Sequence, residues 1–178
     1  MADINNRFDV NSFLNKIMQN ESSGGTNFNH RQIASGHQEG QTAIGRYGLL
    51  PNTVREINQS NINQGKLDPE MIEVSQLPDS SLKQHLEANP DIEQKFAQSM
   101  AQHLQQKYPG DEERMAYAWN NGHRIEAPIT DKQLDDSNYV NKFRRVNEMM
   151  QNRQLLENNQ QKPLESRMGD VKMVENDE

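Results

Sequence analysis

The sequence predicts a mainly α-helical fold, and two observations lead to this prediction. No stretch shows the sustained alternation of apolar and polar residues that marks a half-buried strand, although a short β-hairpin within residues 28–48 is compatible with the pattern. Apolar residues recur every four positions between 91 and 108, as on one face of a helix: Ile92, Phe96, Met100, Leu104 and Tyr108. We therefore expect a compact helical domain built around this segment.

The first half of the chain is expected to hold four helices and one long loop. Asp9 is suited to cap a helix that runs to about Asn20. Residues 22–42 are rich in Ser, Gly, Asn, His and Gln without periodicity, so they are expected to form a loop, and loops of this length are often functional. Further helices are expected to open at Pro51 and at Pro69, and Asp79 or Ser80 is expected to be the N-terminal cap of another.

The second half is expected to hold three helices. Pro109-Gly110 ends the segment 91–108, and the acidic residues 111–113 suit the first turn of a helix that stops at Gly122. A last helix is expected over 136–156, with an apolar face made of Tyr139, Phe143, Val146, Met149 or Met150, and Leu155 or Leu156. The resulting division of the chain is a lead-in over 1–8, a domain over 9–157, and a polar tail over 158–178 that is either solvated or serves for docking.

Composition excludes several classes of protein. Hydrophobic residues make up 32% and mean hydropathy is -1.06, so we expect a small core with wide polar surfaces. The net charge of -7 argues against a nucleic-acid partner. No run approaches the roughly 18 apolar residues of a membrane span, so membrane insertion is not expected. The first residues lack a secretory signal, so we expect a chain made in the cytoplasm.

Glu21 is the first candidate functional residue. It lies four positions after Ile17, on the apolar stripe that also holds Phe13 and Leu14. One interpretation is a helix-end carboxylate bonded to loop amides. The other is an acid whose pKa is raised by burial. The histidines form no metal-binding motif and there is no cysteine, so we expect no metal and no cofactor.

Three segments together resemble a known family. They are 21–24 (Glu-Ser-Ser-Gly), 43–53 (Ala-Ile-Gly-Arg-Tyr-Gly-Leu-Leu-Pro-Asn-Thr) and 118–122 (Ala-Trp-Asn-Asn-Gly). In this order they resemble the motifs of the lysozyme-like superfamily, in particular the soluble lytic transglycosylase branch as found in phage virions. The resemblance covers about residues 9–125. It implies a lysozyme-like fold for the helical domain.

The resemblance also implies a reaction. The family cleaves the β-1,4 bond between MurNAc and GlcNAc in peptidoglycan with one Glu, which acts first as an acid and then as a base. Glu21 matches that residue. The muramoyl 6-hydroxyl then attacks internally and gives a 1,6-anhydro product, so that effective concentration replaces an activated water. The expected partner is therefore the peptidoglycan glycan strand.

The expected substrate-binding residues are Ser22, Tyr47, Gly48, Leu49 and Asn120 from the matching segments, and Glu39 from the loop between the first two. Asn120 is expected to orient the N-acetyl group or the acid, and Tyr47 to touch the sugar or the acid. Gly48 departs from the family, which has Gln at that position in the substrate groove. Trp119 is more typical of a core residue than of a sugar platform.

Two alternatives remain open from the sequence. Glu39, the one acidic residue in the loop 22–42, could supply a second carboxylate beside Glu21 and make the protein a hydrolytic muramidase; a solvated surface position is the other interpretation of Glu39. The chain could also be a non-enzymatic assembly protein on the same fold. Delivery to the wall or periplasm is expected from a phage virion, with a bacterial secretion apparatus as the other route, so virion or secretion proteins are the expected partners.

Overall fold

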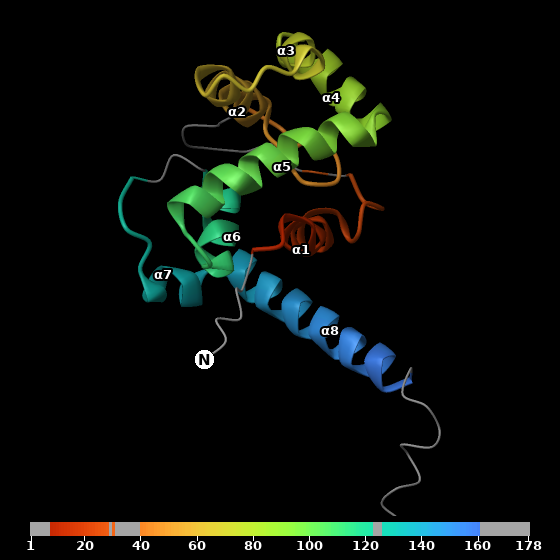
Figure 1. Ribbon diagram of the computed structural model, residues 1–178, viewed down its shortest axis with the longest axis vertical. Helices are drawn as coiled ribbons and strands as arrows, with labels where there is room; N and C mark the ends of the chain where they lie inside the picture. Colours follow the sequence, from red (N-terminus) through yellow and green to blue (C-terminus); the bar gives the residue numbers. More distant parts are fainter. Residues whose placement is uncertain (1–7, 29, 31–39, 123–125, 161–178) are drawn as a thin grey trace, which may run out of the picture.

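The computed structural model describes residues 8–28, 30, 40–122 and 126–160 of the chain, and it confirms the expected mainly α class (Figure 1). The helices of the first half are α1 (Val10–Ser22), α2 (Pro51–Asn63), α3 (Pro69–Ser75) and α4 (Asp79–Ala88). Those of the second half are α5 (Pro90–Lys107), α6 (Glu112–Asn121), α7 (Asp131–Asp136) and α8 (Asn138–Gln160).

Helix α5 runs through the middle of the molecule (Figure 1). It packs against α2, α3 and α4 on one side and against α1 and α6 on the other. The stripe predicted for this helix is buried, with Ile92, Phe96, Met100 and Leu104 at most 2% exposed. Small residues widen the stripe, so neighbouring helices can contact α5 from two sides.

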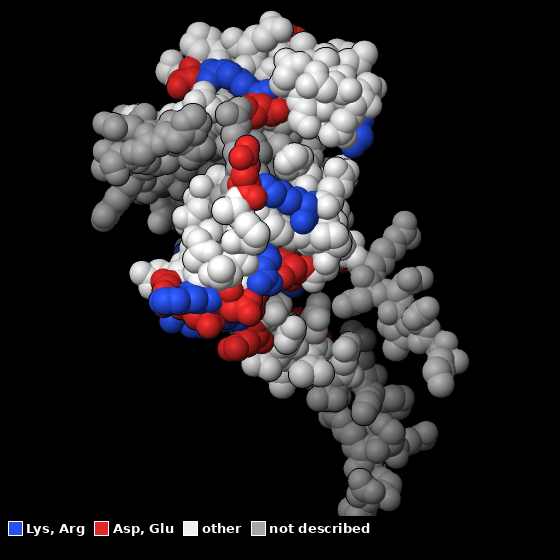
Figure 2. All heavy atoms as spheres, turned by 90° about the vertical axis from the view of Figure 1, so that its left-hand side faces the viewer, with Lys and Arg blue, Asp and Glu red and all other residues white. Residues whose placement is uncertain are grey.

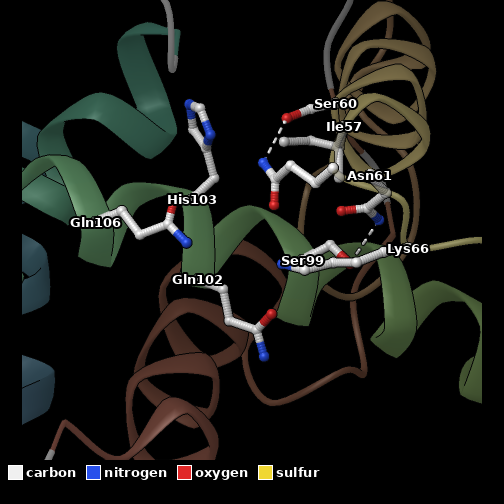
Figure 3. Close-up of a pocket in the computed structure, with 9 residues that line it drawn as sticks. Ile57, Ser60, Asn61, Lys66, Ser99, Gln102, His103 and Gln106 are labelled. Atoms are coloured by element: carbon white, nitrogen blue, oxygen red, sulfur yellow. Dashed lines mark hydrogen bonds between the residues drawn. The ribbon is translucent and has the colours of Figure 1, made fainter.

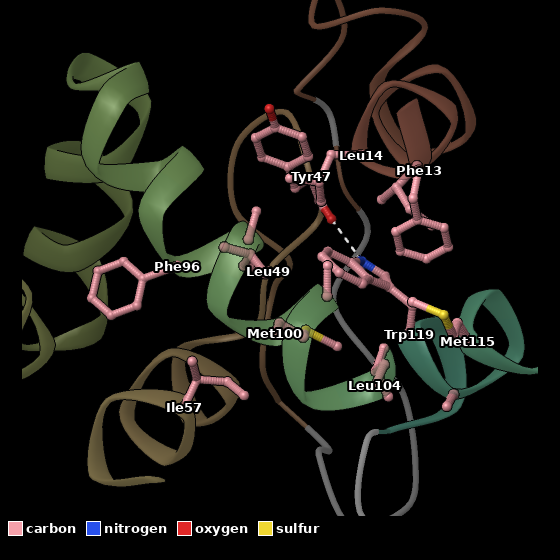
Figure 4. Packing of buried hydrophobic residues seen from close by; sticks show 14 of the residues in the cluster. Phe13, Leu14, Tyr47, Leu49, Ile57, Phe96, Met100, Leu104, Met115 and Trp119 are labelled. Atoms are coloured by element: carbon pink, nitrogen blue, oxygen red, sulfur yellow. Dashed lines mark hydrogen bonds between the residues drawn. The ribbon is translucent and has the colours of Figure 1, made fainter. Parts of the chain in front are cut away.

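An aromatic cluster joins α1, α6 and α8. The ring of Phe13 lies 6.1 Å from Trp119 and 5.9 Å from Phe143, in tilted or edge-on arrangements that aromatic pairs prefer. Trp119 is only 6% exposed, which confirms it as a core residue (Figure 4). Phe8, assigned from the sequence to the lead-in, adds its ring to this cluster 5.7 Å from Phe13.

Most helix starts agree with the sequence. The side chains of Asp9, Asp68 and Asp111 accept hydrogen bonds from backbone N–H groups in the first turns of α1, α3 and α6. The prediction for α4 was wrong: the residue before the helix is Pro78, which has no capping side chain. Asp79 is instead the first helical residue, and its carboxylate accepts from Arg55 Nη2 at 2.7 Å.

The last helix also differs from the expectation. A separate short helix, α7, precedes α8, because Thr130 and Gln133 form a capping box that starts a new helix. The end of α8 extends away from the body (Figure 1), so the expected apolar face is not buried there. Met149, Leu155 and Leu156 are 46%, 60% and 63% exposed.

The described part of the expected hairpin, within 28–48, contains one paired set of residues. Ile44 and Leu49 form one antiparallel bridge, with N···O distances of 2.7 and 3.1 Å, and residues 31–39 lie outside the described ranges. The backbone between this pair is called the 44–49 turn below. Of the helices described, none combines the length and the apolar character that crossing a membrane would require.

Candidate active site

Glu21 lies in the last turn of α1, half-buried, where the helix ends abruptly. The next three residues, Ser23, Gly24 and Gly25, all have positive φ angles of 52°, 77° and 83°. This left-handed stretch turns the chain away from the helix axis directly after Ser22. Glu21 is therefore held on a rigid helix rather than on the loop that follows.

The carboxylate of Glu21 is bonded to helix α8. The Tyr139 hydroxyl donates to Glu21 Oε1 at 2.7 Å. Burial raises the pKa of Glu21, and three groups lower it in part: the Tyr139 hydroxyl, His30 and Lys142. Burial and the neighbouring Glu21 raise the pKa of Tyr139 well above its usual value, so this hydroxyl stays protonated and remains a donor.

Gly48 in the 44–49 turn covers the other oxygen of Glu21. The φ angle of Gly48 is +64°, and a Cβ atom at this position would lie 2.4 Å from Glu21 Oε2. No real side chain tolerates that distance, so only glycine lets the turn rest on the carboxylate. The departure from the family motif at Gly48 therefore has a steric reason, and this position adds no side chain to a substrate groove.

The carbonyl groups of the 44–49 turn are held by side chains from distant segments. His30 Nε2 donates to Gly45 O at 2.7 Å, Ser22 Oγ donates to Arg46 O at 2.7 Å, and Trp119 Nε1 donates to Tyr47 O at 3.0 Å (Figure 4). The three segments that carry the sequence resemblance thus meet at this turn. Their contact could not be inferred from their order in the sequence.

Several residues expected to bind substrate have other surroundings. Ser22 is fully buried, and its hydroxyl bonds to Met18 O, Arg46 O and Gly25 N. Leu49 and Tyr47 are 2% and 4% exposed and belong to the core cluster, so they anchor the 44–49 turn in the hydrophobic core. These three residues therefore stabilise the structure around Glu21 and do not line an open groove.

The remaining two expected contacts differ from these. Asn120 is exposed in the last turn of α6, where a ligand can reach it. Glu39, proposed as the second carboxylate of a hydrolase, lies outside the described residues.

Sequence reasoning missed two site residues, Tyr139 and Glu93. Glu93 on α5 is 1% exposed and accepts from Tyr47 N at 3.0 Å and from Arg46 Nε at 3.2 Å. A signal for Glu93 was present, because it lies four positions before Ala97 on the apolar stripe of α5. Tyr139 was recognised only as part of an apolar face, and nothing local indicates where its hydroxyl points.

Two hollows elsewhere on the surface are separate from Glu21. A small one of about 10 Å³, between α2 and α5, is lined mainly by amide and hydroxyl side chains such as Asn61, Ser99 and Gln102 (Figure 3). A larger one of about 610 Å³ is lined by α1, α6 and α8 residues that include Lys16 and Arg144. Within the described ranges, acidic and histidine side chains form no group of three that could hold a metal ion.

Charges on the surface are mixed. Figure 2 shows Lys and Arg standing beside Asp and Glu on one face rather than forming a patch of one sign. Ion pairs of this kind include Arg114 with Asp131 at 2.7 Å and Arg144 with Glu113 at 2.6 Å. Such exposed pairs contribute little to stability, and this face offers no basic surface to a polyanion.

The contact between Gly48 and Glu21 predicts the effect of adding one methyl group. Gly48→Ala should destabilise the protein by about 1–3 kcal/mol more than Gly65→Ala. Gly65 is the matched control, because its φ is also positive, at +73°, and nothing lies within 4 Å of an added Cβ. Urea unfolding measures both. The excess should disappear when Gly48→Ala is combined with Glu21→Ala, and equal losses in the two single variants would show that the turn does not rest on Glu21.

The raised pKa of Glu21 predicts a pH-dependent gain in stability for Glu21→Gln. Between the ordinary value of 4.5 and the raised pKa, the folded chain holds a proton that the unfolded chain releases, so wild-type stability falls as pH rises through this window. The side chain of the Gln variant does not titrate, so this variant does not lose stability in the same way as pH rises. Its stability relative to wild type should rise from pH 4 to pH 8, as measured by unfolding at several pH values. A stability difference between variant and wild type that stays constant or falls from pH 4 to pH 8 would contradict the raised pKa.

Comparison with protein-family models, with curated proteins and with solved structures gives no match to this chain. The resemblance noted from the three motifs therefore rests on the sequence and stays a prediction.

Proposed function

We propose that the chain cleaves the β-1,4 bond between MurNAc and GlcNAc in peptidoglycan as a lytic transglycosylase, with Glu21 as the single acid and base. The observation that supports this proposal is the half-buried Glu21, whose pKa is raised by burial and which lies where the three motif segments meet. A raised pKa keeps a carboxylic acid protonated near neutral pH, as a general acid requires.

The two oxygens of Glu21 have different surroundings, and this suits proton transfer. Oε1 accepts the Tyr139 hydroxyl, and Oε2 faces Gly48, which has no side chain. We assign the proton for the leaving sugar to Oε2, because Oε1 is bonded to Tyr139; the turn rests on Oε2 through the Gly48 backbone alone, without a side chain. Tyr139 fixes the plane of the carboxyl group, so that the proton is presented in one direction.

The charges around Glu21 suit the second half of the reaction. After protonating the leaving group, Glu21 is an anion, and His30, Lys142 and the Tyr139 hydroxyl all favour that form. The anion then accepts the proton of the muramoyl 6-hydroxyl as that oxygen attacks C1. This step returns the proton to Glu21, so the reaction needs no second carboxylate.

The two candidate reactions differ in the number of carboxylates that they need. A retaining hydrolase would place a second carboxylate about 5–5.5 Å away. Among the described residues, the charged side chains that act on the pKa of Glu21 are His30 and Lys142, and both lower it. Glu39, the second carboxylate of the muramidase alternative, lies outside the described residues, so the products separate the two reactions.

The central experiment compares wild type with Glu21→Gln on purified peptidoglycan. Clearing of turbidity should fall by at least about 100-fold in the variant, because the proton donor is lost. Glu73→Gln, at an exposed acid on α3, should clear as wild type does. Mass spectrometry of the wild-type digest should show 1,6-anhydro ends.

Other outcomes of this experiment reject parts of the proposal. Reducing ends would replace transglycosylation by hydrolysis. Equal activity of wild type and Glu21→Gln would remove Glu21 from the mechanism. If both proteins are inert across the pH range and with the native assembly present, the proposed activity is rejected and the assembly-protein alternative is left.

Tyr139→Phe tests the hydrogen bond to the acid. Since this bond lowers the pKa of Glu21 in part, its loss should raise that pKa and move the alkaline limb of the pH–rate profile to higher pH. The same loss should reduce kcat about tenfold, because the carboxyl group is less well oriented. Tyr108→Phe, at the end of α5, serves as the control. An unchanged profile in Tyr139→Phe would mean that its hydroxyl does not act on Glu21.

A further inference from the structure

The 44–49 turn lies between two carboxylates. On one side, a Cβ atom at Gly48 would lie 2.4 Å from Glu21 Oε2. On the other side, a Cβ atom at Gly45 would lie 2.4 Å from Glu93 Oε1. Both glycines have positive φ, at +65° for Gly45 and +64° for Gly48, so the turn fits closely against both acids.

Glu93 holds the backbone of the turn directly. Its Oε1 accepts from Tyr47 N at 3.0 Å, and its Oε2 accepts from Arg46 Nε at 3.2 Å. Arg46 in turn donates to Pro90 O at 2.5 Å, which ties the same turn to the start of α5. A carboxylate that is 1% exposed is costly unless it is paired and hydrogen-bonded, and here the turn supplies both kinds of partner.

The amide held by Glu93 is adjacent to the glycine that covers Glu21. Tyr47 precedes Gly48 in the chain, so a shift of the Tyr47 N–H moves the Gly48 backbone with it. Trp119 and Ser22 hold neighbouring carbonyl groups, but Glu93 is the acceptor for the Tyr47 N–H. The position of Gly48 on Glu21 therefore depends on Glu93.

We propose that Glu93 is a positioning residue that keeps the 44–49 turn against Glu21 and thereby keeps water away from the catalytic carboxyl group. The catalytic consequence rests on the proposed function, whereas the structural coupling between the two acids does not. Glu93 contacts no open surface, so it acts through the turn and not on a substrate.

The proposal has a defined effect on Glu21. Burial is the largest cause of its raised pKa, and the other groups that act on it are Tyr139 and Lys142 from α8 and His30 from the loop. A loosened turn admits water and removes part of the burial. A fall of about one pH unit in the pKa of Glu21 leaves about a tenth of the protonated form at pH values above that pKa, so kcat would fall about tenfold.

The experiment measures the pKa of Glu21 in the free protein by NMR of the ¹³C-labelled carboxyl group, in wild type, Glu93→Gln and Glu93→Asp. Gln keeps the shape and an acceptor for Tyr47 N but turns a donor toward Arg46. Asp keeps the charge but is one methylene shorter, so it cannot hold the turn in the same place. Both variants should lower the pKa of Glu21 by about one unit. In activity assays both should lower kcat about tenfold and leave KM within twofold.

Ser75→Ala is the matched control for a general loss of stability. It removes a buried hydrogen bond from Asn58 Nδ2 to Ser75 Oγ (2.9 Å), between α2 and α3. The melting temperature should fall, while the pKa of Glu21 stays at its wild-type value. This readout separates positioning from a simple contribution to folding.

Three results would overturn the proposal. The pKa of Glu21 could stay unchanged in both Glu93 variants while the melting temperature falls. It could fall in Glu93→Gln but not in Glu93→Asp, which would indicate direct charge repulsion instead of positioning. If neither variant folds, Glu21→Gln decides: because coupling between two sites is reciprocal, an unchanged pKa of Glu93 in that variant rejects the proposal. None of these measurements needs peptidoglycan, so a failure of the proposed function would be seen separately as a wild type without activity.

Discussion

The contacts of the 44–49 turn are the constraint on which the rest of the site depends. Three successive carbonyl groups accept hydrogen bonds from His30, Ser22 and Trp119, and the Tyr47 N–H donates to Glu93. These partners come from α1, the following loop, α5 and α6. A backbone held from so many directions has little freedom to relax, so the surfaces that rest on it, above all Gly48 on Glu21, have one defined arrangement.

The half-buried Glu21 and the buried Glu93 have different partners on this turn. Burial raises the pKa of Glu93, and the Tyr47 amide and the Arg46 guanidinium group lower it in part. Burial raises the pKa of Glu21 too, and the Tyr139 hydroxyl, His30 and Lys142 lower it in part. One fold thus places two carboxyl groups, each with a pKa raised by burial, on opposite sides of the same turn.

The small core explains how so polar a sequence supports this site. Helix α5 contacts helices on both sides, and the Phe13–Trp119–Phe143 cluster fixes α1 against α6 and α8. Trp119 connects the aromatic cluster to the 44–49 turn, because its ring packs in the cluster and its N–H donates to Tyr47 O. The apolar residues are thereby concentrated among the helices that position Glu21. At the end of α8, by contrast, the apolar side chains are exposed.

The sequence alone determined the mainly α class, the stripe of α5, most helix starts, and Glu21 as an acid on an apolar face. These features follow from periodicity and capping, which depend on residues within a few positions of one another. The tertiary structure alone decided the other features of the site. They are the hydrogen bond from Ser22 to the 44–49 turn, the contact of Gly48 with Glu21, and the hydrogen bonds of Tyr139 and Glu93. The Glu21–Tyr139 bond joins residues 118 positions apart, and it exists because α1 packs on α8. No local pattern in either segment specifies that packing, because it results from the whole core.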